Sequence, residues 1–576
     1  MSKRAMSRTL DERADPVTSG RFCEAVERGD VTAVREMLRR RPEIVDLDWP
    51  EHGEERPIHL AVLRRDPVMV RLLMESGADA RRGIYPNRDA TSAFTLAAER
   101  GDNELAAIIE EEEQRRGACL KPDAGEVRHD PREVVSGDQL AVIQRLEADP
   151  ALGRLCDPGG WTPLHHAAGM LHTRVVQWLL GHGAEVNRRA RGDWTPLDYA
   201  ASGSAWDKDG GAERFEIVAK VLRRAGAELS AVSAVALGEA RWLRARHAEG
   251  KLATARSWDG SGPFAGLLSI AVTHDRPEML ALLLELGLDP DERVRVEGSE
   301  DAVESWGMPL YICARSGRLV MAQNLLERGA DPNGQVLASG SPTFVAYKKK
   351  DRAMIRLLLS HGGALDAASV GYLRQTELAG KMLAGEVDAR LEYGKFSGQT
   401  VAEQLLWSGG SGGDPEIVRM ALEQIDWRPD DPRWFWMLWR PLPGHSPRPE
   451  ADRALYLDCF RQVLKRCDPN LRAPRFGQTM LHEVVARDQG EGVAFAKLLL
   501  EAGAKTDLRD DLLKSTPLGW ACRWGRAALV KLLLERGADP VEAGAEPWAA
   551  PAAWAEKMGH ETIAGLLRSR ADLRAR

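Results

Sequence analysis

The sequence predicts an all-α solenoid, in which helix–turn–helix units joined by short β-hairpin loops are repeated along the chain. Three observations lead to this prediction. Residues 160–187 contain one complete unit of this kind, its pattern returns about every 33 residues, and it recurs along most of the 576 residues. A single unit buries too little apolar surface to fold alone, so the units have to stack on one another.

The unit at residues 160–187 has recognisable start and stop signals. Thr162 is a good N-cap because its hydroxyl can accept a hydrogen bond from an otherwise unpaired amide, and Pro163 takes the first helical position, where no amide hydrogen is needed. Gly183 suits the left-handed backbone that ends a helix. An apolar stripe of helical period lies in the second helix, at Val175, Val176, Leu179 and Leu180. The stripe predicts the face that packs against neighbouring units.

Prolines mark the period of the repeat. Three pairs show it: Pro163 and Pro196, Pro309 and Pro342, and Pro517 and Pro551. The first two pairs are 33 residues apart and the third pair is 34 apart. This period, with the opening Thr-Pro-Leu-His at residues 162–165, resembles the ankyrin-repeat family over residues 22–567. The resemblance implies that the motif histidines hydrogen-bond neighbouring loops and hold adjacent repeats together. The motif histidines are His59, His165 and His482.

The pattern also predicts how the chain is organised. The expected segments are a disordered tail (1–20), N-terminal repeats (21–116), a linker (117–130), central repeats (131–430), a degenerate aromatic-rich repeat (431–475) and C-terminal repeats with a cap (476–570). The first repeat is expected to have helices at residues 22–28 and 31–40. The linker is rich in Gly, Pro and charge, which favours irregular structure.

Composition narrows the class of protein. The net charge of −7 is small for this length, which argues against a general polyanion binder and makes a nucleic-acid partner unexpected. Seven cysteines, an odd number without any Cys-x-x-Cys pair, indicate a reduced cytoplasmic protein. No stretch approaches the ~18 apolar residues that a membrane-spanning helix needs. Arginine far outnumbers lysine, which suggests a GC-rich bacterial genome.

No motif points to catalysis, a metal or a cofactor. Gly-x-Ser-x-Gly, His-Glu-x-x-His and the kinase signature set are all absent, so we name no catalytic residue. The spacing of His, Cys, Asp and Glu gives no convincing zinc ligand set. Residues 409–414 superficially resemble a phosphate loop but lack its Gly-Lys-Ser/Thr ending. We interpret them as an enlarged turn between two helices, capped by Asp414.

Arginines at hairpin tips are the first candidate partner-binding residues. They are Arg188, Arg189 and Arg191, beside Trp194 in one hairpin, and Arg81 and Arg82 in an equivalent earlier loop. Hairpin tips project from the concave edge of such a stack, so these residues could form a positive rim that recognises an acidic partner, and Arg and Trp are typical interface anchors. Alternatively, the arginines pair with nearby acids such as Asp193 and only keep the surface soluble.

The second candidate is the densest aromatic run of the chain. Residues 434–439 read Trp-Phe-Trp-Met-Leu-Trp, and the candidates are Trp434, Trp436 and Trp439. On a helix these side chains would surround the axis and could not all face one core. The run therefore predicts either an aromatic anchor patch for a partner, or a degenerate repeat in which the apolar residues pack inside and the tryptophans cover loops.

The expected function is that of a non-enzymatic protein–protein interaction scaffold or adaptor. It would dock another macromolecule in a concave groove lined by hairpins and first helices, and an inhibitor or immunity protein would be a special case. This step rests on the family resemblance, because a fold does not fix a function. Two alternatives stay open. One is an enzyme whose site lies in the irregular stretches 203–212 or 434–453, and the other is a nucleic-acid-binding solenoid with steep salt dependence.

Overall fold

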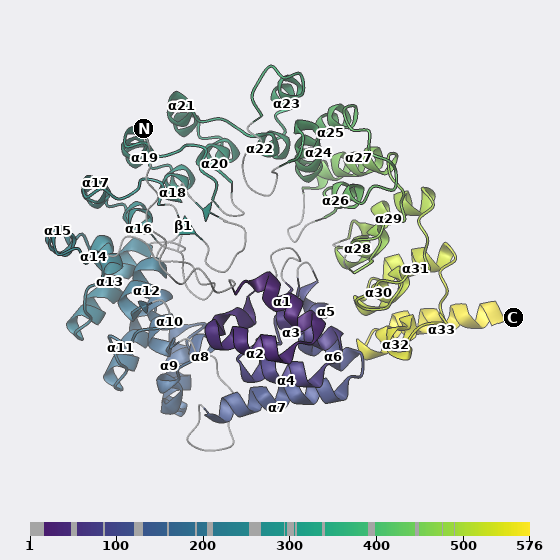
Figure 1. Ribbon diagram of the computed structural model, residues 1–576, viewed down its shortest axis with the longest axis horizontal. Coiled ribbons are helices and arrows are strands. Elements are labelled where there is room, and N and C mark those ends of the chain that lie inside the picture. The colour runs from purple at the N-terminus through teal and green to yellow at the C-terminus, as the bar shows by residue number, and fades with distance from the viewer. Residues whose placement is uncertain are drawn as a thin grey trace. The chain divides into compact units, whose positions relative to one another are not determined.

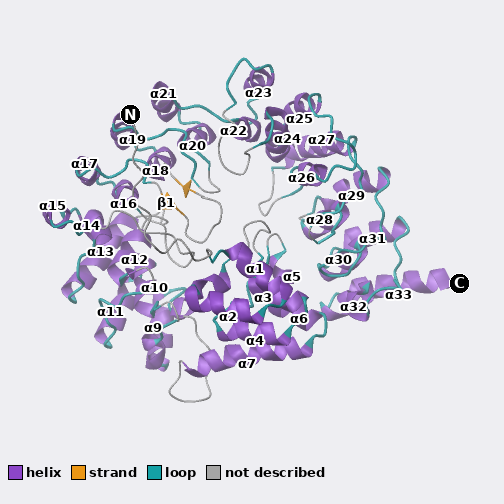
Figure 2. Ribbon diagram, viewed as in Figure 1, coloured by secondary structure: helices purple, strands orange, loops and turns teal. Residues whose placement is uncertain are grey.

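In the computed structural model, the described residues are 17–47, 55–84, 87–119, 131–157, 160–190, 193–203, 211–252, 266–292, 294–295, 304–305, 308–336, 340–389, 398–443, 449–474, 476–488 and 490–575. The chain divides into two compact units. Unit 1 comprises Met1–Arg115 and Asp366–Arg576, and unit 2 comprises Arg116–Leu365. Helices account for almost all the regular structure in the described residues (Figure 2).

The helices follow one another along the chain as labelled in Figure 1. In the N-terminal segment they are α1 (Ser19–Arg28), α2 (Val31–Arg40), η1 (Pro42–Asp46), α3 (Pro57–Leu63), α4 (Pro67–Glu75), α5 (Arg88–Thr91), α6 (Ala93–Glu99) and α7 (Asn103–Cys119). In unit 2 they are α8 (Pro131–Val134), α9 (Gln139–Ala148), η3 (Pro150–Arg154), α10 (Pro163–Gly169), α11 (Thr173–Gly181), α12 (Pro196–Gly203), α13 (Gly211–Arg224), α14 (Ala231–Leu237), α15 (Ala240–Ala248), α16 (Leu267–Thr273), α17 (Pro277–Glu285), α18 (Met308–Ser316), α19 (Leu319–Glu327), α20 (Pro342–Lys349) and α21 (Arg352–Ser360).

The C-terminal part of unit 1 continues the same alternation of short helices. Its helices are α22 (Ala367–Tyr372), α23 (Thr376–Leu383), α24 (Val401–Gly412), α25 (Pro415–Leu422), α26 (Arg433–Trp439), η7 (Glu450–Asp452), α27 (Arg453–Leu464), α28 (Met480–Ala486), α29 (Gly492–Glu501), α30 (Pro517–Arg523), α31 (Ala527–Glu535), η8 (Pro547–Ala549), α32 (Pro551–Lys557) and α33 (Glu561–Ala575).

Each repeat contributes a first and a second helix, and helices of one kind pack on their own kind in the next repeat. In unit 2, the first helices α10, α12, α14, α16, α18 and α20 pack in succession, as do the second helices α17, α19 and α21. In unit 1, α22, α24, α26, α28, α30 and α32 form one such series, and α23, α25, α27, α29, α31 and α33 form the other. Both units are therefore two-layered stacks, and the predicted all-α solenoid is confirmed.

Local sequence explains where the helices begin and end. Thr162 is the N-cap of α10 and Pro163 its first residue. Gly183 has φ of 86°, the left-handed conformation predicted for it after α11. The same pattern of a hydroxyl cap occurs in other repeats, where side chains of Ser92, Ser230, Ser341, Thr400 and Thr516 accept from helix amides. These caps pair backbone amides that the first turn of a helix leaves without partners.

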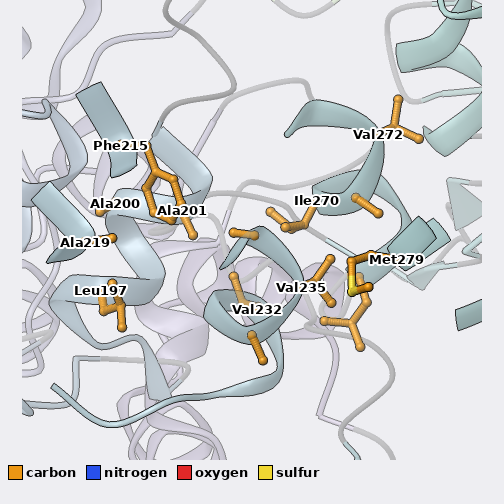
Figure 3. Packing of buried hydrophobic residues seen from close by; sticks show 14 of the residues in the cluster. Leu197, Ala200, Ala201, Phe215, Ala219, Val232, Val235, Ile270, Val272 and Met279 are labelled. Carbon is orange, nitrogen blue, oxygen red and sulfur yellow. The ribbon is translucent and has the colours of Figure 1, made fainter. Parts of the chain in front are cut away.

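The core of unit 2 is one continuous apolar cluster between the two layers. Figure 3 shows side chains from successive helices meeting there, among them Leu197 of α12, Phe215 of α13, Val232 of α14 and Met279 of α17. These side chains are at most 4 % exposed. Each repeat supplies part of this apolar cluster, so the stability of a repeat depends on the repeats next to it.

Short hairpins connect the repeats. The bridges pair Ala190 with Trp194, Val336 with Gly340 and Arg472 with Thr479. Among the described residues the only two-stranded sheet pairs β1 (Val294–Arg295) with β2 (Glu304–Ser305) in antiparallel register.

The interpretation of the glycine-rich stretch was wrong in one respect. Gly409, Gly410 and Gly412 are not a turn but lie in the last turn of α24, and Gly413 follows the helix as its C-cap with φ of 70°. A Cβ on Gly412 would lie 2.6 Å from the carbonyl oxygen of Gly371, so glycine allows α22 and α24 to approach closely. Asp414 does cap the next helix, as predicted, because its carboxylate accepts from the amides of Glu416 and Ile417 at 3.0 and 3.1 Å.

Candidate protein-binding surfaces

The motif histidines are buried and join each repeat to the following hairpin. Nδ1 of His165 accepts from the amide of Thr162 at 3.2 Å, which leaves the proton on Nε2. Nε2 then donates to the carbonyls of Arg188 and Trp194, both at 3.1 Å. Burial lowers the pKa of His165 to about 4, so the ring is neutral at neutral pH. The role implied by the family resemblance is therefore present in the structure.

His59 and His482 repeat this arrangement. Nδ1 of His59 accepts from the amide of Arg56 and Nε2 donates to the carbonyl of Arg82, both at 3.0 Å. His482 makes the corresponding bonds to Thr479 and Ser515, also at 3.0 Å. Burial lowers the pKa of His482 to about 3. These rings are structural links between repeats, and their bonding leaves no ring nitrogen for a metal or a substrate.

The predicted arginine rim on unit 2 is exposed and carries intramolecular ion pairs. Arg188 lies 3.6 Å from Glu185, and Arg189 lies 3.6 Å from Asp193. All four side chains are between 46 and 77 % exposed, and such exposed pairs contribute little stability. Arg191 lies outside the described residues. Trp194, in contrast, is only 4 % exposed and belongs to the apolar core.

The loop that contains Arg81 and Arg82 makes closer contacts than the arginine rim on unit 2. The guanidinium of Arg81 donates to both carboxylate oxygens of Glu113, with Nη2–Oε2 at 2.8 Å and Nε–Oε1 at 3.1 Å. Its guanidinium carbon lies 3.6 Å from the centroid of the Phe94 ring. The bond to Glu113 raises the pKa of Arg81. Arg82 is exposed, and its carbonyl accepts from His59. The same loop thus combines a charged tip with a backbone link to the repeat.

The aromatic run forms α26, and its tryptophans differ in exposure. Trp434 is fully buried, and its Nε1 donates to the carbonyl of Arg428 at 3.0 Å. Trp436 is 41 % exposed and is the only tryptophan among the exposed large apolar side chains of the described residues. Trp439 is half-buried, and its Nε1 donates to Oε2 of Glu483 at 2.8 Å.

Around α26, tryptophans and arginines from successive first helices stack on one another. We call Trp407, Trp436, Trp439, Arg440 and Arg487 the Trp–Arg cluster. The guanidinium of Arg440 lies 3.1 Å from the ring centroid of Trp407 and 5.1 Å from that of Trp439, and Arg487 lies 3.8 Å from Trp439. The Trp436 and Trp439 rings meet edge-on, with centroids 6.3 Å apart. Such contacts between cations and indole rings hold both kinds of side chain in place.

Sequence reasoning identified the tryptophans of α26 but not Trp407, Arg440 or Arg487. A signal existed for the two arginines, because Arg440 and Arg487 both occupy the position directly after a first helix, α26 and α28. Aligning these degenerate repeats by their helix ends would have brought the two positions together.

The remaining chemistry of the described residues is limited. Within the described ranges, no three His, Cys, Asp or Glu side chains gather as a metal site would require. A search of the same ranges finds no helix with the length and apolarity to cross a bilayer. The stretches 204–210 and 444–448, where an irregular catalytic site was considered, lie outside the described residues.

Comparisons with known proteins agree with the repeat pattern. A family model for three ankyrin repeats matches residues 134–229 and 451–543, and a model for a single ankyrin repeat matches residues 308–335. The B-cell lymphoma 3 protein homolog of Mus musculus is 30 % identical over 169 residues, which are 27 % of this chain and 35 % of that protein. An ankyrin repeat-containing protein of Treponema pallidum is 34 % identical over 96 residues, covering 17 % of this chain and 30 % of that protein.

Two further matches are a curated relative and a solved structure. The 2-5A-dependent ribonuclease of Mus musculus is 39 % identical over 67 residues, which are 12 % of this chain and 9 % of that protein. The crystal structure of the human ASB11 ankyrin repeat domain is 21 % identical, covers 41 % of this chain and 86 % of that chain, and has a TM-score of 0.23. The matched segments thus span no more than 35 % of the length of these three relatives.

The repeat period, the motif histidines, the two-layered stacks and the family models all point to one class. The chain is an ankyrin-repeat protein, with family-model matches at residues 134–229, 308–335 and 451–543. Ankyrin repeats are protein–protein interaction modules and their proteins are generally not enzymes, so the chain carries such a module.

Proposed function

We propose that this protein is a non-enzymatic scaffold or adaptor that binds one protein partner, and that the Trp–Arg cluster is an anchor of the binding surface. An inhibitor or immunity protein, which blocks a single partner, would be a special case of this function. The proposal places the protein in the bacterial cytoplasm. The arginine-rich composition and the seven cysteines, none of them in a Cys-x-x-Cys pair, support that location.

The observation that carries the proposal is the exposure of Trp436 within this cluster. A tryptophan that is 41 % exposed leaves much apolar surface in water. Its neighbour Trp439 is held by Glu483 and stacked against Arg487, so the surface around Trp436 is preorganised. Rigid Trp and Arg side chains make strong anchors, because little conformational entropy remains to be lost on binding.

The cluster is built from first helices, the layer that lines the concave side of an ankyrin stack. Trp407 lies on α24, Trp436 lies on α26, and Arg487 directly follows α28. A partner that lies across these three helices would contact successive repeats at once. A surface of this kind suits an extended or convex protein segment rather than a small molecule.

The partner is expected to present acidic side chains. On unit 2, the ion pairs of Arg188 and Arg189 are exposed and 3.6 Å long, so they contribute little. A carboxylate of a partner can therefore replace Glu185 or Asp193 at small cost. Long-range attraction by these arginines would act mainly on the rate of association.

The test begins with capture of the partner. The full chain is used to isolate its partner from the native organism, the partner is identified by mass spectrometry, and its affinity is then measured by calorimetry. We expect Trp436→Ala to weaken binding about tenfold or more, as loss of an interface anchor does. The melting temperature should fall less than for a fully buried tryptophan, because Trp436 is 41 % exposed.

Val68→Ala is the matched control. Val68 is 59 % exposed on the second helix α4 and lies on the other layer of unit 1. The Val68→Ala substitution removes exposed apolar surface but does not change the first-helix layer. The affinity for the partner should therefore equal that of the unaltered chain. Equal affinities of the Trp436→Ala and unaltered chains would remove the Trp–Arg cluster from the binding site.

A further inference from the structure

Two helix ends that are far apart in sequence meet within unit 1. Arg523, the last residue of α30, forms a bidentate ion pair with Glu99, the last residue of α6, 424 positions away. Nη2 of Arg523 lies 2.8 Å from Oε1 of Glu99, and Nε lies 3.3 Å from Oε2. The two side chains are 5 % and 11 % exposed. Both helices belong to the same compact unit.

Further polar contacts surround this ion pair. Nε1 of Trp524 donates to Oδ2 of Asp89 at 3.0 Å, and the same oxygen lies 3.6 Å from Nη1 of Arg523. In the opposite direction, Arg100 donates to the carbonyl of Leu512, and its guanidinium carbon lies 5.8 Å from the centroid of the Trp548 ring. Each segment therefore supplies both a donor and an acceptor to the other.

This contact does not follow from the repeat architecture. In a stack of repeats each unit contacts only its neighbours, so a contact across 424 positions is an addition to the nearest-neighbour scheme. A buried ion pair contributes little net stability, because both charges lose their hydration. The bidentate geometry of Arg523 and Glu99 selects a planar carboxylate at one position.

We propose that the N-terminal repeats are an intramolecular partner of the C-terminal repeats. In the free chain, Asp89 and Glu99 dock on the Arg523–Trp524 end of α30, and we call this contact the clasp. The clasp fills a carboxylate-binding position in the C-terminal repeats. An acidic side chain of another protein can form an ion pair with Arg523 only if it displaces Glu99. The clasp therefore inhibits binding of external carboxylates at Arg523.

Cysteine cross-linking of the full chain tests whether the clasp exists and whether it forms within one molecule. Asp89→Cys and Trp524→Cys are introduced together in a background in which Cys119 and Cys156 are serine, and a short bismaleimide is added. Direct contact between these two side chains predicts fast cross-linking. The control pair combines Asp89→Cys with Lys531→Cys, an exposed position on α31, and should react at least tenfold more slowly.

Mixed ¹⁴N- and ¹⁵N-labelled chains distinguish the possible partners. Cross-linked peptides of a single isotope would place the clasp within one chain. Peptides of mixed isotope would show that the contact joins two copies, and a rate no higher than that of the control pair would show that it is absent. Either of these last two results overturns the proposal.

Charge reversal tests the ion pair itself. In the double-cysteine chain, Glu99→Arg alone and Arg523→Glu alone should each slow cross-linking at least tenfold. The two reversals together should bring the rate back to within about threefold, because the opposite charges again face each other. Circular dichroism checks that every variant keeps its helix content. Single reversals without effect, or a double reversal no faster than the singles in folded chains, would contradict the clasp.

Discussion

Replacing His482 by alanine tests how strongly a motif histidine joins adjacent repeats. The fully buried ring bonds the amide of Thr479 and the carbonyl of Ser515, each at 3.0 Å. In the variant the Thr479 amide loses its acceptor, as does the Thr479 hydroxyl at 2.9 Å from Nδ1, which unlike the amide can rotate to another acceptor. The Ser515 carbonyl keeps the amide of Asp510 at 3.0 Å. One unpaired buried donor costs about 1–3 kcal/mol, and the cavity left by the ring adds about 1 kcal/mol, so we expect a loss of about 2–4 kcal/mol.

Hydrogen exchange followed by mass spectrometry measures this loss where it occurs. Since each 1.4 kcal/mol corresponds to a tenfold change, protection of α28 and α30 should fall by about 30- to 700-fold. Peptides from α10 should keep their protection, because coupling in a stack is between neighbours. His361→Ala is the control, since His361 is exposed at the end of α21. Unchanged exchange in α30, or the same loss in the control, would refute the reasoning.

The cost of His482→Ala should also depend on pH. Burial holds the pKa of His482 near 3, below its ordinary value of 6.5. Between these values the unfolded chain binds a proton that the folded chain does not, so this histidine lowers the stability of the unaltered chain by about 1.4 kcal/mol for each pH unit below 6.5. The variant lacks this effect. Its disadvantage should therefore shrink by about 2 kcal/mol between pH 7.5 and pH 5, and equal costs at both values would contradict the pKa assignment.

Two further predictions concern the core and the arginine rim. Leu179 is 1 % exposed and Leu180 is half-buried, so Leu179→Ala should cost about 2–5 kcal/mol and Leu180→Ala clearly less; equal shifts in melting temperature would contradict this. Replacing Arg188, Arg189 and Arg191 together with Glu should weaken binding of the captured partner about tenfold or more and flatten its salt dependence, with little change in melting temperature. Unchanged affinity would remove the rim from the binding site.

Local signals were sufficient to place most helices. The second helix of the first repeat was expected at residues 31–40, and α2 has these bounds. The first helix was expected to begin at Phe22 but begins at Ser19, because the side chain of Thr18 caps it. Caps, prolines and apolar stripes act within a few residues, so they can be recognised in a single sequence.

Features that depend on distant residues could not be recognised in this way. At Gly412 of α24 a side chain would collide with the backbone of Gly371 in α22, and nothing within the glycine-rich segment itself indicates that neighbour. In the aromatic run, Trp434 and Trp436 lie about 200° apart around a helix, so one is buried and the other exposed. The sequence gives the spacing of the two tryptophans, but the orientation of the helix depends on its packing.

The degenerate repeats raise the question of how they stack without the motif histidine. In α12, Asp198 stands at the third helical position, where α10 has His165. Its carboxylate accepts from the amide of Thr195 at 3.4 Å and from the hydroxyl of Ser230 in the next repeat. The imidazole donates to the next repeat, whereas this carboxylate accepts from it.

In two other repeats, different polar groups link the first helix to the segment that follows it. Glu403, at the third position of α24, accepts from the amide of Thr400 at 2.7 Å and from Arg433 of the next repeat at 2.9 Å. At α16 the following loop supplies the acceptor, since buried Glu292 accepts from the hydroxyl of Ser269 at 2.6 Å. The third position of these helices is therefore not limited to histidine. His165, Asp198 and Glu403 each make one polar bond within the first turn and one to the neighbouring repeat, whereas Ser269 makes only the bond to the following loop. Because several residue types can form the link to the following segment, repeats can depart from the consensus in sequence and still stack in the same layers.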